Sequence, residues 1–139
     1  MAIRLIRRYR FAASHLYRRP EWSEEENLRR FGKCSNLPGH GHNYRLTVTV
    51  TGEVGPQTGF VVDLAELDRI VGREVLEQVD HHHLNIAVPE FAEGGRIPSS
   101  ENLVAWIHPR LTKALPAGVR LVSVRVAEDE DLAAEWNAD

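Results

Sequence analysis

The sequence predicts an α+β domain in which helices cover one face of an antiparallel sheet. Strand patterns follow one another in the first half of the chain, two helix patterns occupy the middle, and strand patterns return near the C-terminus. Strands grouped apart from helices are typical of α+β folds rather than of alternating strand–helix units. With 139 residues, of which 42% are hydrophobic, residues 1–139 are expected to form a single domain around one core.

Three stretches of the first half are predicted to be strands. Residues 3–14 alternate between apolar and polar side chains, except that Arg7 falls on the apolar side. Residues 43–52 show the clearest alternation, and residues 60–62 predict a short strand after a turn rich in Gly and Pro. Between the first two strands, the polar residues 17–33 are expected to form an excursion with one helical turn.

Two helices are predicted in the middle of the chain. Apolar residues recur at helical spacing over residues 64–79, and Asp63 is a suitable N-cap for this helix. A second helix is predicted to begin after a cap at Ser99 or Ser100. Pro109 lies inside this second pattern and is expected to kink the helix or to disturb its regularity.

The C-terminal part predicts a last clear strand over residues 119–128, and residues 132–136 fit a further short strand. Glu128 is in phase with three valines of the strand and should therefore face the interior, where a charge needs a partner. Two interpretations follow. Either the strand ends before Glu128 and its side chain reaches solvent, or Glu128 binds the donor-rich edge of a guanidine-like heterocycle.

Composition and charge narrow the class of function. The net charge of -3 gives no general attraction to nucleic acid or to an anionic membrane. No apolar run of about 18 residues and no secretory segment is present, so a cytoplasmic location is expected. Basic side chains gather in residues 1–33 and acidic ones in residues 127–139. The basic residues form either a solvated surface or the contact for a phosphorylated substrate.

Three histidines carry the strongest functional signal. His40 and His42 are in phase with the apolar face of the strand that follows them, and His15 is in phase with that of the first strand. A single histidine on an apolar face is usually a core residue, but three directed toward one interior predict a metal site. Imidazole ligands suit zinc best, with iron, nickel and copper as alternatives, and three ligands leave a coordination position open for chemistry.

Further candidates lie outside the histidine set. Cys34, the only cysteine, is either a small buried hydrophobe or a thiolate whose pKa a nearby cation lowers. Asp80 and His81 begin a histidine run that is a surface metal-binding run, a solvated helix end, or a carboxylate-oriented imidazole for proton transfer. The last interpretation requires an irregular turn. Glu101, near the start of the second helix, is expected to interact with the helix dipole or to make local hydrogen bonds.

Together these residues resemble the 6-pyruvoyl-tetrahydropterin synthase family, which includes the 6-carboxy-tetrahydropterin synthases of queuosine biosynthesis. The resemblance extends over nearly the whole chain and depends on an ordered set of short motifs. These motifs are Phe11-Ala12-Ala13-Ser14-His15, Ser23-Glu24-Glu25-Glu26-Asn27-Leu28, Phe31-Gly32-Lys33-Cys34, Gly39-His40-Gly41-His42-Asn43-Tyr44, Asp80-His81, Ser99-Ser100-Glu101-Asn102 and Val126-Ala127-Glu128.

The resemblance implies the tunnelling fold, a four-stranded antiparallel sheet with two helices on one face. It also implies trimers whose sheets close into a barrel, and two such trimers stacked into a homohexamer. The implied cofactor is zinc, and the implied proton relay is shared across a subunit interface. The implied roles are metal binding by His15, His40 and His42, proton relay by Cys34, Asp80 and His81, and pterin binding by Glu128, assisted by Glu101 and the backbone around Ser99 and Ser100.

The implied activity is elimination of triphosphate from 7,8-dihydroneopterin triphosphate with rearrangement of its side chain, as in tetrahydrobiopterin biosynthesis. The six-residue step from Cys34 to His40 favours the pyruvoyl-forming branch, whereas the run from Asp80 to Asn85 is closer to the carboxy-forming branch. We expect the pyruvoyl synthase. The alternatives are the carboxy-forming enzyme and a protein that binds a metal or pterin without turnover. The acidic tail after Glu128 departs from the family pattern.

Overall fold

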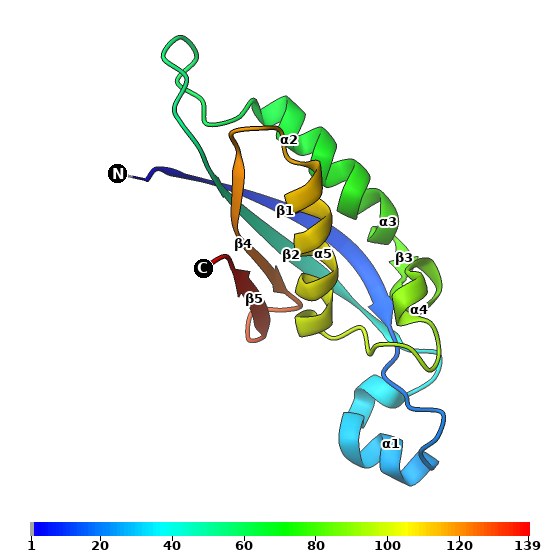
Figure 1. Cartoon of the computed structure of the whole chain (residues 1–139). Helices are drawn as coiled ribbons and strands as arrows, with labels where there is room; N and C mark the ends of the chain where they lie inside the picture. The colour runs from blue at the N-terminus through cyan, green and yellow to red at the C-terminus, as the bar shows by residue number, and fades with distance from the viewer. Residues whose placement is uncertain (1) are drawn as a thin grey trace.

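The computed structural model describes residues 2–139 as one sheet with helices packed across one of its faces (Figure 1). The strand order is β3-β1-β2-β4-β5. The strands are β1 (Arg4–His15), β2 (His40–Thr51), β3 (His82–His83), β4 (Arg120–Ala127) and β5 (Ala133–Asn137). The α-helices are α1 (Glu24–Phe31), α2 (Leu64–Val71), α3 (Glu77–Val79), α4 (Leu84–Ala87) and α5 (Ser100–Ala114). No helix of the described part of the chain has the length and apolar character needed to cross a membrane.

The sheet is mixed rather than purely antiparallel. Strands β1, β2, β4 and β5 pair antiparallel with their neighbours, as predicted. The two residues of β3 pair in parallel with β1, where Ala13 faces His82. The expectation of a four-stranded antiparallel sheet therefore missed a fifth, very short strand. The sheet of one chain is open, and closure of several sheets into a barrel stays a prediction.

The core lies between the sheet and the long helices. The alternation of β2 directs its apolar side chains at α5 and at the helical segment that begins with α2, and both helices present apolar residues at helical spacing. The most completely buried members of this core include Tyr44, Leu46, Val48, Val50, Leu67, Val71, Leu103, Ile107 and Leu111.

Arg7, the one charged residue on the apolar side of β1, is explained by a partner on α2. Its Nη2 lies 2.9 Å from Oδ2 of Asp68, and its Nε donates to Oδ1 at 3.1 Å. The hydroxyl of Tyr9 donates to the same carboxylate at 2.7 Å. These hydrogen bonds, that of Arg7 first, hold the pKa of Asp68 below its usual range. The pattern violation in the sequence thus marks a contact between sheet and helix.

The predicted helices are present, with two differences in detail. The segment from Leu64 to Val79 is helical throughout but contains a π-helical turn over Gly72–Leu76. Helix α5 continues through Pro109 to Ala114, and Ser99 caps it by accepting a hydrogen bond from Asn102 N at 3.1 Å.

The prediction of a short strand at residues 60–62 is wrong. These residues belong to the loop between β2 and α2, which projects beyond the end of the sheet (Figure 1). Backbone hydrogen bonds close this loop on itself, from Gly55 N to Phe60 O at 2.9 Å and from Gly59 N to Gly55 O at 2.8 Å. Phe60 is 51% exposed. An aromatic and two valines have strand character, but without a neighbouring strand they form none.

Replacing Ile107 by alanine should destabilise the fold markedly. Ile107 is fully buried on α5, so the substitution removes apolar contact and leaves a cavity, which costs about 2–5 kcal/mol. Ile86→Ala is the matched control because Ile86 is 83% exposed, and its cost should stay within about 0.5 kcal/mol. Urea unfolding followed by circular dichroism measures both. Equal losses in the two variants would contradict the assigned core.

Candidate active site

Three histidine rings gather where β1 ends and β2 begins. His15 closes β1, and the antiparallel register places it opposite His40. The ring centroids are 4.8 Å apart for His15 and His40 and 4.9 Å apart for His15 and His42. The remaining pair, His40 and His42, is also separated by 4.9 Å. All three histidines singled out in the sequence therefore lie in one cluster.

His15 is the most enclosed member of the cluster, with 0% exposure. Its Nδ1 lies 2.8 Å from the hydroxyl of Tyr44, so the opposite nitrogen, Nε2, is the one that faces the cluster. Burial, followed by the proximity of His42 and His40, lowers the pKa of His15 to about 3. A neutral imidazole is the form that binds metals, and the partner on Nδ1 holds the ring in position for it.

Buried polar atoms without partners support a bound cation at this cluster. His42 Nε2 and Glu128 Oε1 have no hydrogen-bond partner within the described chain, and they lie 3.5 Å apart. Ligand atoms of His15, His42 and Glu128 lie within 4.8 Å of one another. A second such group consists of His15, Cys34 and His40. A divalent cation would satisfy the unpartnered Nε2 of His42, and the donors around it are mostly imidazole, so the residues fit zinc.

Cys34 lies beside this cluster in the 3₁₀ turn Gly32–Ser35. Its Sγ is 3.9 Å from Nε2 of His40. Burial and, to a lesser extent, the negative charge of Glu128 raise the pKa of the Cys34 thiol. The protein's own groups therefore do not lower this pKa, whereas a cation bound at the histidines would act in that direction.

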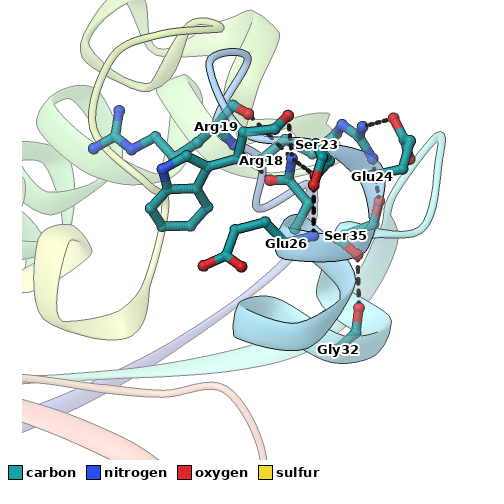
Figure 2. A network of polar contacts seen from close by, with 9 residues as sticks. Arg18, Arg19, Ser23, Glu24, Glu26, Gly32 and Ser35 are labelled. Carbon is teal, nitrogen blue, oxygen red and sulfur yellow. Dashed lines mark hydrogen bonds and ion pairs between the residues drawn. The ribbon is translucent and has the colours of Figure 1, made fainter.

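Polar contacts hold the segment between β1 and β2 in place, and with it Cys34 (Figure 2). Arg18 donates from Nη1 to the carbonyl of Ser35 at 3.0 Å, and its guanidinium is paired with Glu24. The N–H of Tyr17 donates to the carbonyl of Cys34 at 2.8 Å. The Tyr17 ring also packs on His15 with centroids 4.5 Å apart, so the same residue contacts the thiol loop and the histidine cluster.

Gly39 brings the two histidine-bearing strands, β1 and β2, into close approach. Its φ of 119° is unfavourable for other residues, and a Cβ at this position would overlap the carbonyl oxygen of His15. His83 lies against the same turn, with its Nε2 3.0 Å from the carbonyl oxygen of Pro38. His83, which the sequence suggested only as part of a histidine run, thus supports the turn that leads into His40.

Asp80 and His81 lie on the outer edge of β1. Asp80 Oδ1 accepts a hydrogen bond from Ala12 N at 2.9 Å, and His81 N donates to Ala12 O at 2.6 Å. The irregular turn that an Asp80–His81 contact requires is present, because His81 has a φ of 60° and its Nδ1 lies 3.0 Å from Asp80 Oδ1. The hydrogen bonds of Ala12 and His81 lower the pKa of Asp80. Within the described chain, no hydrogen bond or ion pair joins this pair to Cys34.

Of the residues expected to bind a pterin, Glu128 lies against the histidine cluster, with its Oε1 3.5 Å from Nε2 of His42. Glu128 directly follows β4 and is 8% exposed, so its side chain faces the interior rather than solvent. Ser100 is also buried, and its hydroxyl has no hydrogen-bond partner within the described residues. The hydroxyl of Ser99 is used as the cap of α5. Glu101 is exposed in the first turn of that helix.

Sequence reasoning missed the residues that position the site. Asn85 accepts from Leu16 N at 2.9 Å and donates to Leu16 O at 2.8 Å, which fixes the chain just after His15. Asn27, only 1% exposed, makes the same double contact with the backbone of Arg19 at 2.8 and 3.1 Å. Asparagines in polar segments carry no distinguishing pattern. Tyr44, the hydrogen-bond partner of His15, differs from the asparagines in this respect. Its position two residues after His42 indicates that both side chains lie on the same face of the strand.

Comparisons with known proteins identify the family of this chain. A profile of the family described as 6-pyruvoyl tetrahydropterin synthase matches residues 4–139. The 6-pyruvoyl tetrahydrobiopterin synthase of Homo sapiens is 43% identical over 125 residues, covering 90% of this chain and 84% of the human protein. A dihydroneopterin monophosphate aldolase of Pyrococcus furiosus is 30% identical over 135 residues, covering 97% of each chain.

A solved structure extends the similarity to three dimensions. The 6-pyruvoyl tetrahydropterin synthase of Caenorhabditis elegans matches this chain with a TM-score of 0.87 and 32% identity, covering 100% of this chain and 97% of the other. Sequence and fold therefore agree over almost the entire length. The chain belongs to the 6-pyruvoyl tetrahydropterin synthase family.

Proposed function

We propose that this protein is a zinc-dependent 6-pyruvoyl-tetrahydropterin synthase, a lyase that eliminates triphosphate from 7,8-dihydroneopterin triphosphate and rearranges its side chain. The observation that carries the proposal is the cluster of three histidines with Cys34 and Glu128 at its border. The 43% identity to the human synthase supports the choice of reaction. The cytoplasmic location stays a prediction from the sequence.

His15, His40 and His42 would hold the zinc ion. When bound there, zinc supplies Lewis-acid polarisation of oxygen atoms on the substrate's side chain. The Sγ of Cys34, 3.9 Å from a proposed ligand, is positioned to remove a proton from a carbon beside such an oxygen. General-base removal of this kind contributes about 10²–10⁴-fold in rate.

Glu128 is the proposed anchor of the pterin ring. A pterin presents a guanidine-like edge of N–H donors. The two oxygens of a carboxylate can accept hydrogen bonds from this edge. Glu128 is buried, and one of its oxygens lacks a hydrogen-bond partner within the described chain, as such an anchor requires before the ligand binds. The unpartnered hydroxyl of Ser100 and the carboxylate of Glu101 at the start of α5 are proposed to assist.

Asp80 and His81 are proposed to serve the site of a neighbouring subunit. The pair lies on the outer edge of the sheet, and the His81 side chain is 82% exposed. An acid–base pair at this edge is accessible to a second chain that pairs alongside β1. This position supports a shared site and, by family analogy, a hexamer built from two trimers.

The carboxy-forming reaction of queuosine biosynthesis is the second candidate. The run from Asp80 to Asn85 favours it, because this run resembles that branch more closely. The aldolase activity named for the Pyrococcus furiosus relative shows that proteins of similar sequence carry out different reactions on related pterins.

Incubation of the enzyme with 7,8-dihydroneopterin triphosphate should yield 6-pyruvoyl-tetrahydropterin and inorganic triphosphate. Mass spectrometry of the pterins together with a phosphate assay identifies both products. A reaction without enzyme provides the background rate. If 6-carboxy-tetrahydropterin is the main pterin, the carboxy-forming alternative replaces the proposal.

Cys34→Ala should abolish most turnover while leaving the metal in place. Loss of the base lowers kcat by about 10²–10⁴-fold, whereas the three histidines still bind zinc. Steady-state kinetics and elemental analysis measure the two quantities on the same preparation. Cys34 also lies within reach of His15 and His40, so loss of zinc in this variant would make it a ligand and reject its role as the base.

His42→Ala should lower the zinc content well below that of the wild type, because the cluster loses one of three imidazole ligands. His108→Ala is the matched control, since His108 stacks on Trp136 with ring centroids 4.2 Å apart, outside the cluster. Elemental analysis after dialysis gives the zinc content of each variant. Full occupancy in His42→Ala would exclude His42 as a required ligand.

A further inference from the structure

The face of the sheet opposite the helices carries an unusual pair of like charges. The β1–β2 register places Arg10 directly opposite Arg45, and both side chains are exposed. In the next row, Arg8 and Arg125 lie on either side of Thr47. Like charges directly opposite one another on neighbouring strands destabilise a sheet. The directly opposed pair Arg10 and Arg45 therefore carries a cost that the fold alone does not explain, and Arg8 and Arg125 add to the positive charge nearby.

Carboxylates of the same chain do not neutralise these charges. Within the described residues, no ion pair joins Arg8, Arg10, Arg45 or Arg125 to an acidic group. Arg7, by contrast, lies on the opposite face of β1 and is paired with Asp68. The guanidinium groups of the open face are thus available to an external anion.

Two hollows connect these arginines to the proposed proton-transfer pair. The larger, of about 700 Å³, is lined by Arg8, Arg10, Arg45 and Arg125, with acidic residues on the side of the β4–β5 turn. The smaller, of about 480 Å³, is lined by Arg10, Arg45 and Asn43 together with Asp80 and His81. Arg10 and Arg45 border both hollows, so an anion bound between them lies beside His81.

We propose that Arg10 and Arg45, assisted by Arg8, bind a linear oligophosphate, and that this anion is the triphosphate chain of the substrate held at the site that Asp80 and His81 serve, that of the neighbouring subunit. The inference rests on the proposed function, and it assigns residues to the leaving group. Guanidinium groups bind phosphate oxygens in pairs, and several of them match the multiple charges of an oligophosphate.

The acidic side chains Asp129, Glu130 and Glu135 on the rim of the larger hollow restrict where an anion can lie. They repel it from the β5 side and direct it toward the β1–β2 rows, where Arg10 faces Arg45. Glu135 lies opposite Arg125, which makes Arg125 the least available of the four arginines. The charge distribution thus favours an anion next to the Asp80–His81 pair.

Titration calorimetry of the purified enzyme with inorganic triphosphate tests the site without requiring turnover. We expect binding that weakens with added salt, and a Kd at least about tenfold higher in the double variant R10Q/R45Q. R69Q/R73Q is the matched control, because it removes the same charge from exposed positions on the helical side of the molecule. Equal affinity of the two double variants, or no binding by the wild type, would overturn the proposal.

Kinetics with 7,8-dihydroneopterin triphosphate distinguishes the two sources of the anion. If the site holds the substrate's own chain, R10Q/R45Q raises KM about tenfold or more, and inorganic triphosphate inhibits the wild type competitively. An unchanged KM with lost triphosphate binding would overturn the assignment to the substrate and leave a site for free oligophosphate. Triphosphate binding without any pterin product would refute the proposed function while supporting the anion site.

Discussion

Twelve consecutive residue pairs join β1 to β2, from Arg4 and Thr51 at one end to His15 and His40 at the other. This register decides which side chains meet at the end of the sheet. Because side chains alternate between faces, a slip by one residue would turn His40 and His42 away from the interior and would break the apolar face of β2 at the same time. The burial that stabilises the sheet therefore also holds the proposed ligands on one side of it.

The segment between β1 and β2 places Cys34 next to the histidines that the register brings together. It follows His15 and ends before His40, so both of its attachment points are proposed ligands. Side-chain amides bond its backbone at two places, and a backbone hydrogen bond ties Tyr17 to Cys34. A polar segment with a small apolar interior thus holds the thiol near the histidines through hydrogen bonds rather than through a large core.

The sequence was most informative where periodicity and burial coincide. The long strands and the inward direction of His15, His42 and Glu128 follow from alternation, and both long helices follow from helical spacing, because one face of each element must be apolar. Features that depend on tertiary contacts were not predictable in this way. The π-helical turn, the two-residue β3 and the backbone contacts of Asn85 result from packing between distant segments. The valines after Phe60 show that local preference alone is not sufficient. Their residue types favour a strand, but no neighbouring strand pairs with them, and none forms.

The close approach at Gly39 has a consequence for how this part of the chain can diverge. With His15 fixed against it on one strand and His40 following it on the other, the turn leaves no room for a larger residue or for a change in length next to His40. Insertions and deletions between Cys34 and His40 must therefore be absorbed between Cys34 and Pro38. Evolution can reposition the Cys34 sulfur relative to the histidines there while the geometry of the histidine cluster stays constant, which gives one scaffold a route to different chemistries.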